Sequence, residues 1–213
     1  MQTVGLIDYD RGNLRSVEKA LERVGCQVVL VETRDDFARV DPQVIVLPGV
    51  GAFGDAMRNL EERDLIIPIK EWLSENRPFL GICLGYQLLF EESEESPGVE
   101  GIGYFPGKVV RFPDSVGKVP HMGWNQVSWQ SDHKSALRDV FSSNPYYYHV
   151  HSYYPAVESR GNRGQCETEY GIRIISGMTE GNIAAFQFHP EKSQEAGINL
   201  LRCLFETQFS SNR

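Results

Sequence analysis

The chain is poor in cysteine, and its cysteines are not spaced as metal ligands or as a disulfide framework. Its 213 residues include four of them, and no Cys-x-x-Cys pair occurs. This usage disfavours a zinc site and a compact disulfide-stapled scaffold. It suits a reduced compartment, so we expect a cytoplasmic protein without a metal site.

Long apolar runs and an excess of positive charge are also absent. No stretch of about 18 apolar residues is present, and residues 1–3 lead directly into a strand-like segment without a charged leader. The 21 Lys and Arg residues against 29 Asp and Glu residues give a formal charge of -8. This balance argues against nucleic acid or an anionic membrane surface as the main partner. We therefore expect neither export nor membrane insertion.

The chain does contain enough apolar residues, 41% of the total, for one sizeable core. We expect a single domain over residues 1–213. Continuous apolar runs, typical of parallel strands covered on both faces, occur at residues 4–9, 26–31, 44–47 and 78–82. Helical spacing between them is found at residues 14–24, 57–62 and 69–75. This alternation predicts an α/β fold.

The pattern changes after residue 96. Predicted strands at residues 109–112, 146–151, 172–178 and 183–188 are separated by polar loops with few helical stretches. We expect a mixed sheet in this half of the chain. An apolar-rich segment at residues 198–205 predicts a final helix that packs back on the sheet.

The most informative segment is Gly81-Ile82-Cys83-Leu84-Gly85, which continues directly from an apolar strand pattern. A nucleophile between two glycines, where a strand turns sharply into a helix, is held exposed and strained. We expect that helix over residues 85–92, with its first-turn amides favouring the thiolate of Cys83. The alternative is a buried structural cysteine at a strand–helix corner.

A second motif, Phe188-His189-Pro190-Glu191, closes another apolar run far downstream. His189 supplies a base for the thiol. Glu191 can accept the ring N–H and hold the imidazole in the tautomer that takes a proton from sulfur. A surface His-Pro-Glu turn without chemistry is the alternative. Together the two motifs predict a Cys-His-Glu nucleophilic system.

A glycine-rich loop, Pro48-Gly49-Val50-Gly51-Ala52-Phe53-Gly54, follows the third predicted strand. Its unobstructed backbone amides suit an oxyanion site. The same residues match the Gly-x-Gly-x-x-Gly pattern of dinucleotide sites, but that pattern belongs after the first strand. The acidic residue about twenty positions on, Glu71, also falls in a predicted helix instead of at a strand end. No other phosphate-loop or metal-helix motif is present, so we expect no cofactor.

Three segments taken together resemble the motifs of the class I (triad) glutamine amidotransferases, in the same order and with similar separation. They are residues 48–51, 81–87 and 188–193. The resemblance implies a three-layer, flavodoxin-like α/β fold with a central, mostly parallel mixed sheet.

Further segments resemble one branch of that family, the glutaminase subunits of imidazole glycerol phosphate synthases, and this match covers nearly the whole chain. They are residues 8–9 with 12–17, 120–125 and 151–153. The hexapeptide at residues 120–125 discriminates best, because glutaminases of other pathways share the Cys and His-x-Glu motifs but usually lack it. Asp10 and Arg11 depart from the small or apolar residues usual in their loop.

The resemblance implies hydrolysis of L-glutamine to glutamate and ammonia through a thioester on Cys83. His189 then moves the proton and Glu191 orients the imidazole, while backbone amides of Gly51 and Leu84 form the oxyanion hole. The residues implied to hold the glutamine are Gly49, Gln87, Glu95, His151, Ser152 and Tyr153.

One of these, Glu95, has another interpretation. On its own it belongs to an acidic run at residues 91–95 that is typical of a solvated helix end.

The resemblance also implies a partner. In this family a cyclase subunit, a (β/α)8 barrel, receives the ammonia through a channel and forms imidazole glycerol phosphate and aminoimidazole carboxamide ribonucleotide in histidine biosynthesis. The implied heterodimer interface includes Asn13, His121, Met122, Trp124, Asn125 and Lys192. Aromatic anchors concentrate at such surfaces. Ordinary loop packing is the alternative for residues 121–125, and for residues 146–148 we expect a strand with aromatic cross-strand pairs.

Two other functions stay open from the sequence. One is a related hydrolase on the same scaffold, either a glutaminase that serves a different synthase or a cysteine peptidase or amidase. The other is a non-catalytic docking subunit. Residues 120–125 favour the histidine pathway, and the presence of Cys83, His189 and Glu191 together argues against a loss of catalysis.

Overall fold

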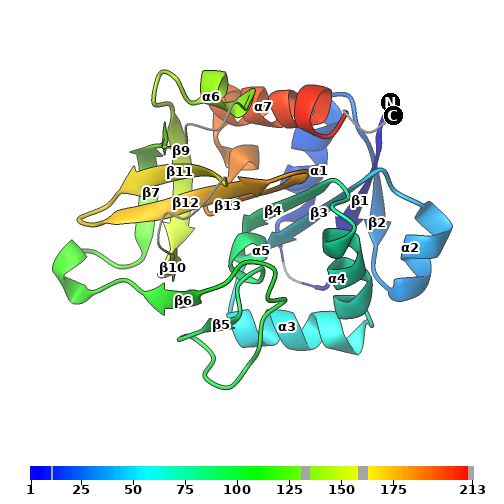
Figure 1. Ribbon diagram of the computed structural model, residues 1–213, viewed down its shortest axis with the longest axis horizontal. Helices are drawn as coiled ribbons and strands as arrows, with labels where there is room; N and C mark the ends of the chain where they lie inside the picture. The colour runs from blue at the N-terminus through cyan, green and yellow to red at the C-terminus, as the bar shows by residue number, and fades with distance from the viewer. Residues whose placement is uncertain (11, 131–134, 158–162, 211–213) are drawn as a thin grey trace.

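The computed structural model describes residues 1–10, 12–130, 135–157 and 163–210. Its centre is an eight-stranded sheet with helices on both faces, and two smaller sheets lie beside one end of it (Figure 1). In spatial order the strands of the main sheet are β2 (Gln27–Val31), β1 (Thr3–Ile7), β3 (Val44–Gly49), β4 (Phe79–Cys83), β13 (Ile183–Phe186), β12 (Arg173–Glu180), β11 (Gly164–Glu169) and β8 (Ser128–Trp129).

The strands from β2 to β13 run parallel to their neighbours, and β12, β11 and β8 continue the sheet in antiparallel fashion. The prediction of a mostly parallel mixed sheet is therefore confirmed. Every residue of the central strands β3 and β4 is buried. Strands that helices cover on both faces need such continuous apolar sequences.

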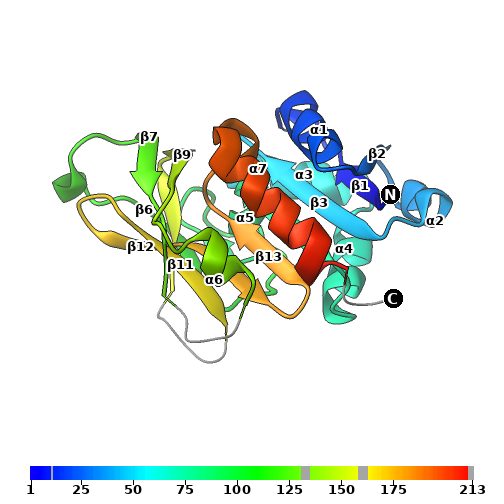
Figure 2. The same ribbon diagram turned by 90° about the horizontal axis from the view of Figure 1, so that it is seen from above.

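Helices cover both faces of the sheet and enclose one apolar cluster on each (Figure 2). They are α1 (Leu14–Arg23), α2 (Arg34–Val40), α3 (Phe53–Glu62), α4 (Ile66–Ser74), α5 (Leu84–Gln87), α6 (Leu137–Val140) and α7 (Gln194–Cys203). Leu21 of α1 and Leu201 of α7 belong to one cluster, to which α6 also contributes. Leu60 of α3 and Trp72 of α4 belong to the other, with α5. None of the helices in the described ranges is long and apolar enough to cross a membrane.

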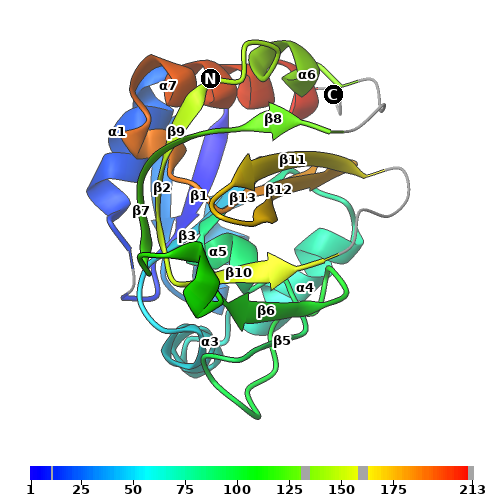
Figure 3. The ribbon, with the colours of Figure 1, turned by 90° about the vertical axis from the view of Figure 1, so that its left-hand side faces the viewer.

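Two small sheets extend the antiparallel end of the molecule, beside β11 and β12 (Figure 3). One contains β10 (Tyr153–Ala156), β6 (Lys108–Arg111) and β5 (Glu92–Ser93), and the other pairs β7 (His121–Gln126) with β9 (Tyr146–His151). Short 3-10 helices cover Asp114–Val116 and Pro190–Lys192, and a π-helical turn over Leu204–Gln208 follows α7. Because β9 leads directly into β10, residues from this extension reach the carboxyl end of the parallel strands.

The helix predicted after the nucleophile motif is wrong in length. It was expected over residues 85–92, but α5 ends at Gln87. Leu88, Leu89 and Phe90 are all fully buried in a turn, and the Glu91 N–H donates to the Gly107 carbonyl oxygen at 3.1 Å. A turn that buries every side chain has the same apolar sequence as a buried helix, so the pattern could not distinguish them.

Several elements have no counterpart among the predictions, including α2, β7, β10 and β11. Helix α2 packs on the core only through the partly buried Phe37 and Val40, so its sequence carries no wide apolar stripe. Residues 121–125, for which loop packing was an alternative, lie in strand β7, where Trp124 pairs with Tyr148 of β9. Their rings lie 6.1 Å apart, which confirms the predicted aromatic cross-strand pairing.

The turn from β4 into α5 depends on a close backbone contact. A Cβ atom at Gly85 would lie 1.9 Å from the Leu47 carbonyl oxygen of β3. A glycine at this position therefore allows the start of α5 to rest directly on the neighbouring strand. This contact fixes the direction in which the chain leaves Cys83.

We expect Gly85→Ala to lower the free energy of unfolding by about 3 kcal/mol or more, because backbone cannot move aside for the new methyl group. Gly103→Ala is the control. Gly103 has a φ of +74° but open space around its missing Cβ, so that variant should lose about 1 kcal/mol from backbone strain alone. Urea unfolding curves measure both. Equal stability of Gly85→Ala and the unmodified chain would contradict the packing argument.

Candidate active site

Cys83 lies where the carboxyl ends of three parallel strands meet. It is the last residue of β4, and its φ of 55° and ψ of -105° are unusual for a residue with a side chain. On one side Gly49 of β3 is its register partner. On the other side Phe186 pairs with Ile82, so the next residue, Gln187, comes beside Cys83. The predicted sharp turn at the cysteine is therefore present.

His189 and Glu191 form a buried pair near this point. The imidazole Nδ1 lies 2.7 Å from Glu191 Oε1, and both side chains are almost fully buried. The His189 N–H donates to the Tyr148 carbonyl oxygen at 2.9 Å, and the Ser193 hydroxyl donates to the His189 carbonyl oxygen at 2.6 Å. The carboxylate holds the proton on Nδ1, which leaves Nε2 for proton exchange with another group.

Cys83 and Glu191 control the charge of His189. Burial by itself lowers the pKa of His189, but the neighbouring Cys83 sulfur, by charge and by hydrogen bonding, and the Glu191 carboxylate outweigh it and raise the pKa to about 10. His189 therefore keeps its second proton at neutral pH when the cysteine is a thiolate. An imidazolium beside a sulfur nucleophile is the resting state that a Cys–His pair needs.

A cavity of about 370 Å³ opens over the sulfur. Its size suits a small metabolite. It is lined by Val50, Gly51, Cys83, Leu84, Gln87, Glu95, Val150, His151, Ser152 and Tyr153. Both predicted oxyanion residues and five of the six predicted substrate residues are in this set. The sixth, Gly49, is not a lining residue, because its position is packed against Tyr9 and Leu84.

The amino end of α3 is already occupied by side chains. Glu95 Oε2 accepts the Phe53 N–H at 2.7 Å, and Ser96 Oγ accepts the Gly54 N–H at 2.9 Å. In a dinucleotide site these amides would bind the pyrophosphate. A carboxylate in that place repels an anion, so the geometry disfavours the dinucleotide interpretation of the Gly-x-Gly-x-x-Gly match. Residues 91–95 are also not a helix, unlike the acidic helix end considered for Glu95.

Gln187 is a residue of the site that no sequence motif indicated. It is fully buried, its Oε1 accepts a hydrogen bond from Gln87 Nε2 at 3.0 Å, and its Nε2 lies 3.8 Å from Cys83 Sγ. One signal in the sequence could have indicated it: a glutamine stands in an apolar run, two residues before His189. Buried glutamines are uncommon and need hydrogen-bond partners.

Three other histidines form a cluster of ring contacts, and one of them, His151, lines the cavity. The ring of His121 lies 4.5 Å from that of His149, 5.1 Å from that of His151 and 3.9 Å from that of Tyr170. Burial lowers the pKa of each histidine, and with the charge of His121 it brings the pKa of His151 to about 3. These imidazoles are neutral at physiological pH. Among the described residues no group of His, Cys, Asp and Glu is arranged to hold a metal ion.

The residues predicted to contact a partner do not all lie at the surface. Met122 and Trp124 are exposed on the outer face of β7, and Asn13 is exposed at the start of α1. Asn125 and Lys192 are partly buried, with the Lys192 ammonium 5.9 Å from the Tyr148 ring centre. His121 differs from the prediction because it is fully buried in the histidine cluster. Arg11, whose departure from the family pattern was noted, lies outside the described residues.

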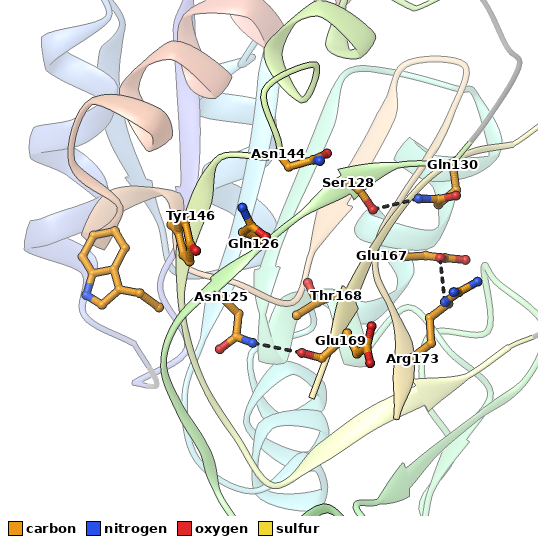
Figure 4. Close-up of a pocket in the computed structure, with 11 residues that line it drawn as sticks. Asn125, Gln126, Ser128, Gln130, Asn144, Tyr146, Glu167, Thr168, Glu169 and Arg173 are labelled. Atoms are coloured by element: carbon orange, nitrogen blue, oxygen red, sulfur yellow. Dashed lines mark hydrogen bonds and ion pairs between the residues drawn. The ribbon is translucent and has the colours of Figure 1, made fainter. Parts of the chain in front are cut away.

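A second hollow of about 360 Å³ lies between the β7–β9 pair and the neighbouring strands β8, β11 and β12 (Figure 4). It is lined by Trp124, Asn125, Gln126, Ser128, Gln130, Asn144, Tyr146, Glu167, Thr168, Glu169 and Arg173. Two of its charged groups pair within it, with Arg173 Nε 3.5 Å from Glu167 Oε2. No lining residue is shared with the cavity at Cys83, so this hollow takes no part in the chemistry described above.

We expect Glu191→Gln to lower the pKa of His189 by about one unit or more, because the variant lacks the negative charge that favours the imidazolium. His189 would then lose its proton at a lower pH than in the unmodified chain, where the pKa is about 10. NMR titration of the imidazole resonances measures this shift. Glu195→Gln, at an exposed carboxylate that pairs with Arg23, should leave it unchanged. An unaltered titration in Glu191→Gln would show that the carboxylate does not control His189.

Comparison with known proteins agrees with this arrangement. The sequence model of the family glutamine amidotransferase class-I matches residues 5–206. The imidazole glycerol phosphate synthase subunit HisH of Aquifex aeolicus (strain VF5) is 46% identical over 201 residues, which cover 94% of each chain. The subunit of the same name from Geobacter metallireducens is 44% identical over 208 residues, covering 95% of this chain and 97% of that protein.

Solved structures show the same fold at low sequence identity. A crystal structure of a glutamine amidotransferase has a TM-score of 0.71 at 17% identity and covers 95% of this chain and 97% of that chain. A glutamine amidotransferase from Thermotoga maritima has a TM-score of 0.65 at 20% identity and covers 99% of both chains. With the family match and the close relatives, these findings place the chain in the class-I glutamine amidotransferase family and, within it, among the HisH subunits of imidazole glycerol phosphate synthase.

Proposed function

We propose that this chain hydrolyses L-glutamine to glutamate and ammonia through a thioester on Cys83. One observation carries the proposal: the strained Cys83 lies beside the buried His189–Glu191 pair and lines one small cavity, to which Gln87 and Glu95 also contribute. The family match supports glutamine as the substrate class.

The reaction follows from the charges in the site. The Cys83 thiolate attacks the carboxamide carbon of glutamine, and His189 gives its Nε2 proton to the departing nitrogen, which leaves as ammonia. The resulting thioester is attacked by water. Neutral His189 takes a proton from that water, the thiolate departs, and glutamate is released with the imidazolium–thiolate pair restored.

Backbone groups at Gly51 and Leu84 would stabilise the oxyanion in both steps. They approach the same cavity from β3 and from the start of α5. Gly51 has a φ of +100°, a conformation that side chains rarely allow. Donors fixed in place before the reaction stabilise the developing charge without reorganisation.

The cavity offers acceptors to the charged end of the substrate. Gln87 Nε2 donates to the Tyr153 carbonyl oxygen at 2.9 Å and to Gln187 Oε1 at 3.0 Å, so Gln87 presents its Oε1 to a ligand. Glu95 uses Oε2 for the Phe53 N–H, which leaves Oε1 for an ammonium group. An α-amino acid carries such an ammonium group, so these acceptors suit glutamine.

We further propose that the ammonia passes to a cyclase subunit, a (β/α)8 barrel, in a heterodimer that makes imidazole glycerol phosphate and aminoimidazole carboxamide ribonucleotide. The relatives named as subunits of that synthase support this partner. Met122, Trp124 and Tyr146 form an exposed apolar face on the β7–β9 pair, and exposed Val50 lines the cavity. An apolar surface next to a reaction site suits a docking partner. The four cysteines are all free, which supports a reduced, cytoplasmic setting.

The other candidate functions have less support. A cysteine peptidase, an amidase or a glutaminase of another synthase would not explain relatives of one name over more than nine-tenths of the chain. A non-catalytic docking subunit would have no reason to keep the Cys83, His189 and Glu191 arrangement.

We expect Cys83→Ala to lower glutamine-dependent glutamate release by at least about 1,000-fold, because it removes the nucleophile. Release is measured with the cyclase subunit and its nucleotide ligand present. Synthesis from free ammonium should remain, since that half-reaction belongs to the partner. Cys203→Ala, at a cysteine away from the cavity, is the control. Full glutamate release by Cys83→Ala would exclude the thioester mechanism.

We expect Trp124→Ala to weaken binding of the cyclase subunit by roughly 30-fold, the loss typical of an aromatic anchor at an interface. Calorimetry measures the dissociation constant. Ile67→Ala is the matched control, because Ile67 is an exposed apolar residue on α4, away from the β7–β9 pair. Equal affinity of Trp124→Ala and the unmodified chain would exclude this face as the docking surface.

A further inference from the structure

We propose that Gln187 donates a hydrogen bond from its side-chain amide to the sulfur of Cys83 and stabilises the nucleophile as a thiolate. The inference deepens the proposed function and depends on it for its kinetic consequence. Its chemical part, the state of the sulfur, can be tested without glutamine.

Sheet register brings the two residues together. The pairs Ile183–Phe79 through Phe186–Ile82 align β13 with β4. One step further along each chain gives Gln187 and Cys83. Residues side by side on parallel strands project to the same face of the sheet. The Gln187 N–H donates to the Ser176 carbonyl oxygen at 2.8 Å, which holds the residue in line after β13 ends.

The hydrogen bonds determine which end of the Gln187 amide faces the sulfur. The Tyr153 carbonyl oxygen can only accept, so Gln87 must turn its Nε2 toward it. The same Nε2 also donates to Gln187 Oε1 at 3.0 Å. The other end of the Gln187 amide is then the NH2 group, and it lies 3.8 Å from Cys83 Sγ. These three contacts together place an N–H donor of the Gln187 side chain beside the Cys83 sulfur.

Full burial makes this donor persistent. Gln187 has no exposed surface, so its amide cannot turn to solvent, and a buried amide is retained where its hydrogen bonds are satisfied. The amide does not titrate. Unlike His189, which is charged in one step and neutral in the next, it donates to the sulfur throughout the reaction.

A donor to the sulfur favours the charged form over the thiol or the thioester. It therefore stabilises the thiolate before attack and again when the thiolate leaves the thioester. Four titratable groups near Cys83 also act on this equilibrium: His189 and its partner Glu191 on one side, Glu95 and His151 in the cavity.

The test is the rate of Cys83 alkylation by iodoacetamide across a pH series, followed by peptide mass spectrometry on the full chain. Peptide resolution separates Cys83 from the other cysteines, including Cys26, where burial raises the pKa to about 11. Gln187→Met keeps the length of the side chain and removes the donor. Gln187→Asn keeps an amide but withdraws it from the sulfur. Gln165→Met is the control, because Gln165 is a buried glutamine on β11 and is not a lining residue of the cavity.

We expect the pH midpoint of alkylation to rise by roughly one unit in both Gln187 variants and to stay unchanged in Gln165→Met. In complex with the cyclase subunit, kcat for glutamate release should fall about tenfold, with a smaller change in KM. A normal midpoint in Gln187→Met, with or without a defect in Gln187→Asn, would mean that Gln187 only fills space and would overturn the proposal.

A measurement on the unmodified chain covers the case in which neither variant folds. The side-chain amide resonance of Gln187 should shift in NMR spectra with the same pH midpoint as alkylation. If the chemical shift of this resonance does not change when Cys83 titrates, Gln187 does not donate a hydrogen bond to the sulfur. If the unmodified chain in complex with the cyclase subunit releases no glutamate although these tests succeed, the proposed function fails, but the hydrogen bond between Gln187 and Cys83 is still supported. If glutamate is released but the tests fail, only the role of Gln187 is refuted.

Discussion

The site depends on the backbone turn at Cys83. The strained dihedral angles of that residue persist because β4 is enclosed between β3 and β13 and because Gly85 rests on the Leu47 carbonyl oxygen. A turn held in this way aims the sulfur at the carboxyl end of the sheet. Ligands of open α/β sheets bind at this end, because loops from neighbouring strands converge there.

Four histidines lie within the same region, and their surroundings separate them into two kinds. His189 has a carboxylate on one ring nitrogen and a sulfur nucleophile near the other, so it stays protonated through neutral pH. His121 stacks on His149 and meets His151 edge-on, and none of the three has an anionic partner among the described residues, so burial keeps them neutral. Partners, not residue type, therefore decide which histidine can move a proton. These three histidines support the wall of the cavity, which includes His151.

The antiparallel extension completes a site that the parallel strands begin. Strand β9 leads into Ser152 and Tyr153 at the cavity wall, and its Tyr148 carbonyl oxygen also binds the His189 backbone. The outer face of the same strand, with that of β7, carries exposed Tyr146 and Trp124. One pair of strands thus contacts the catalytic base on the inside and offers an apolar face outside. A partner bound at that face would lie close to the catalytic base.

The sequence by itself determined the α/β class and the parallel strands, and it marked Cys83 and the His189–Glu191 pair as candidates, because these follow from local patterns: continuous apolar runs, a cysteine between glycines, and a carboxylate two residues from an imidazole. It did not determine where the chain stops being helical after Gln87, since a buried turn and a buried helix have the same apolar composition. It also gave no sign that Gln187 lies beside the sulfur or that His121 is buried, because these facts come from register between strands far apart in the chain. Only the tertiary structure decides such contacts, because pairing between distant strands depends on the packing of the whole sheet.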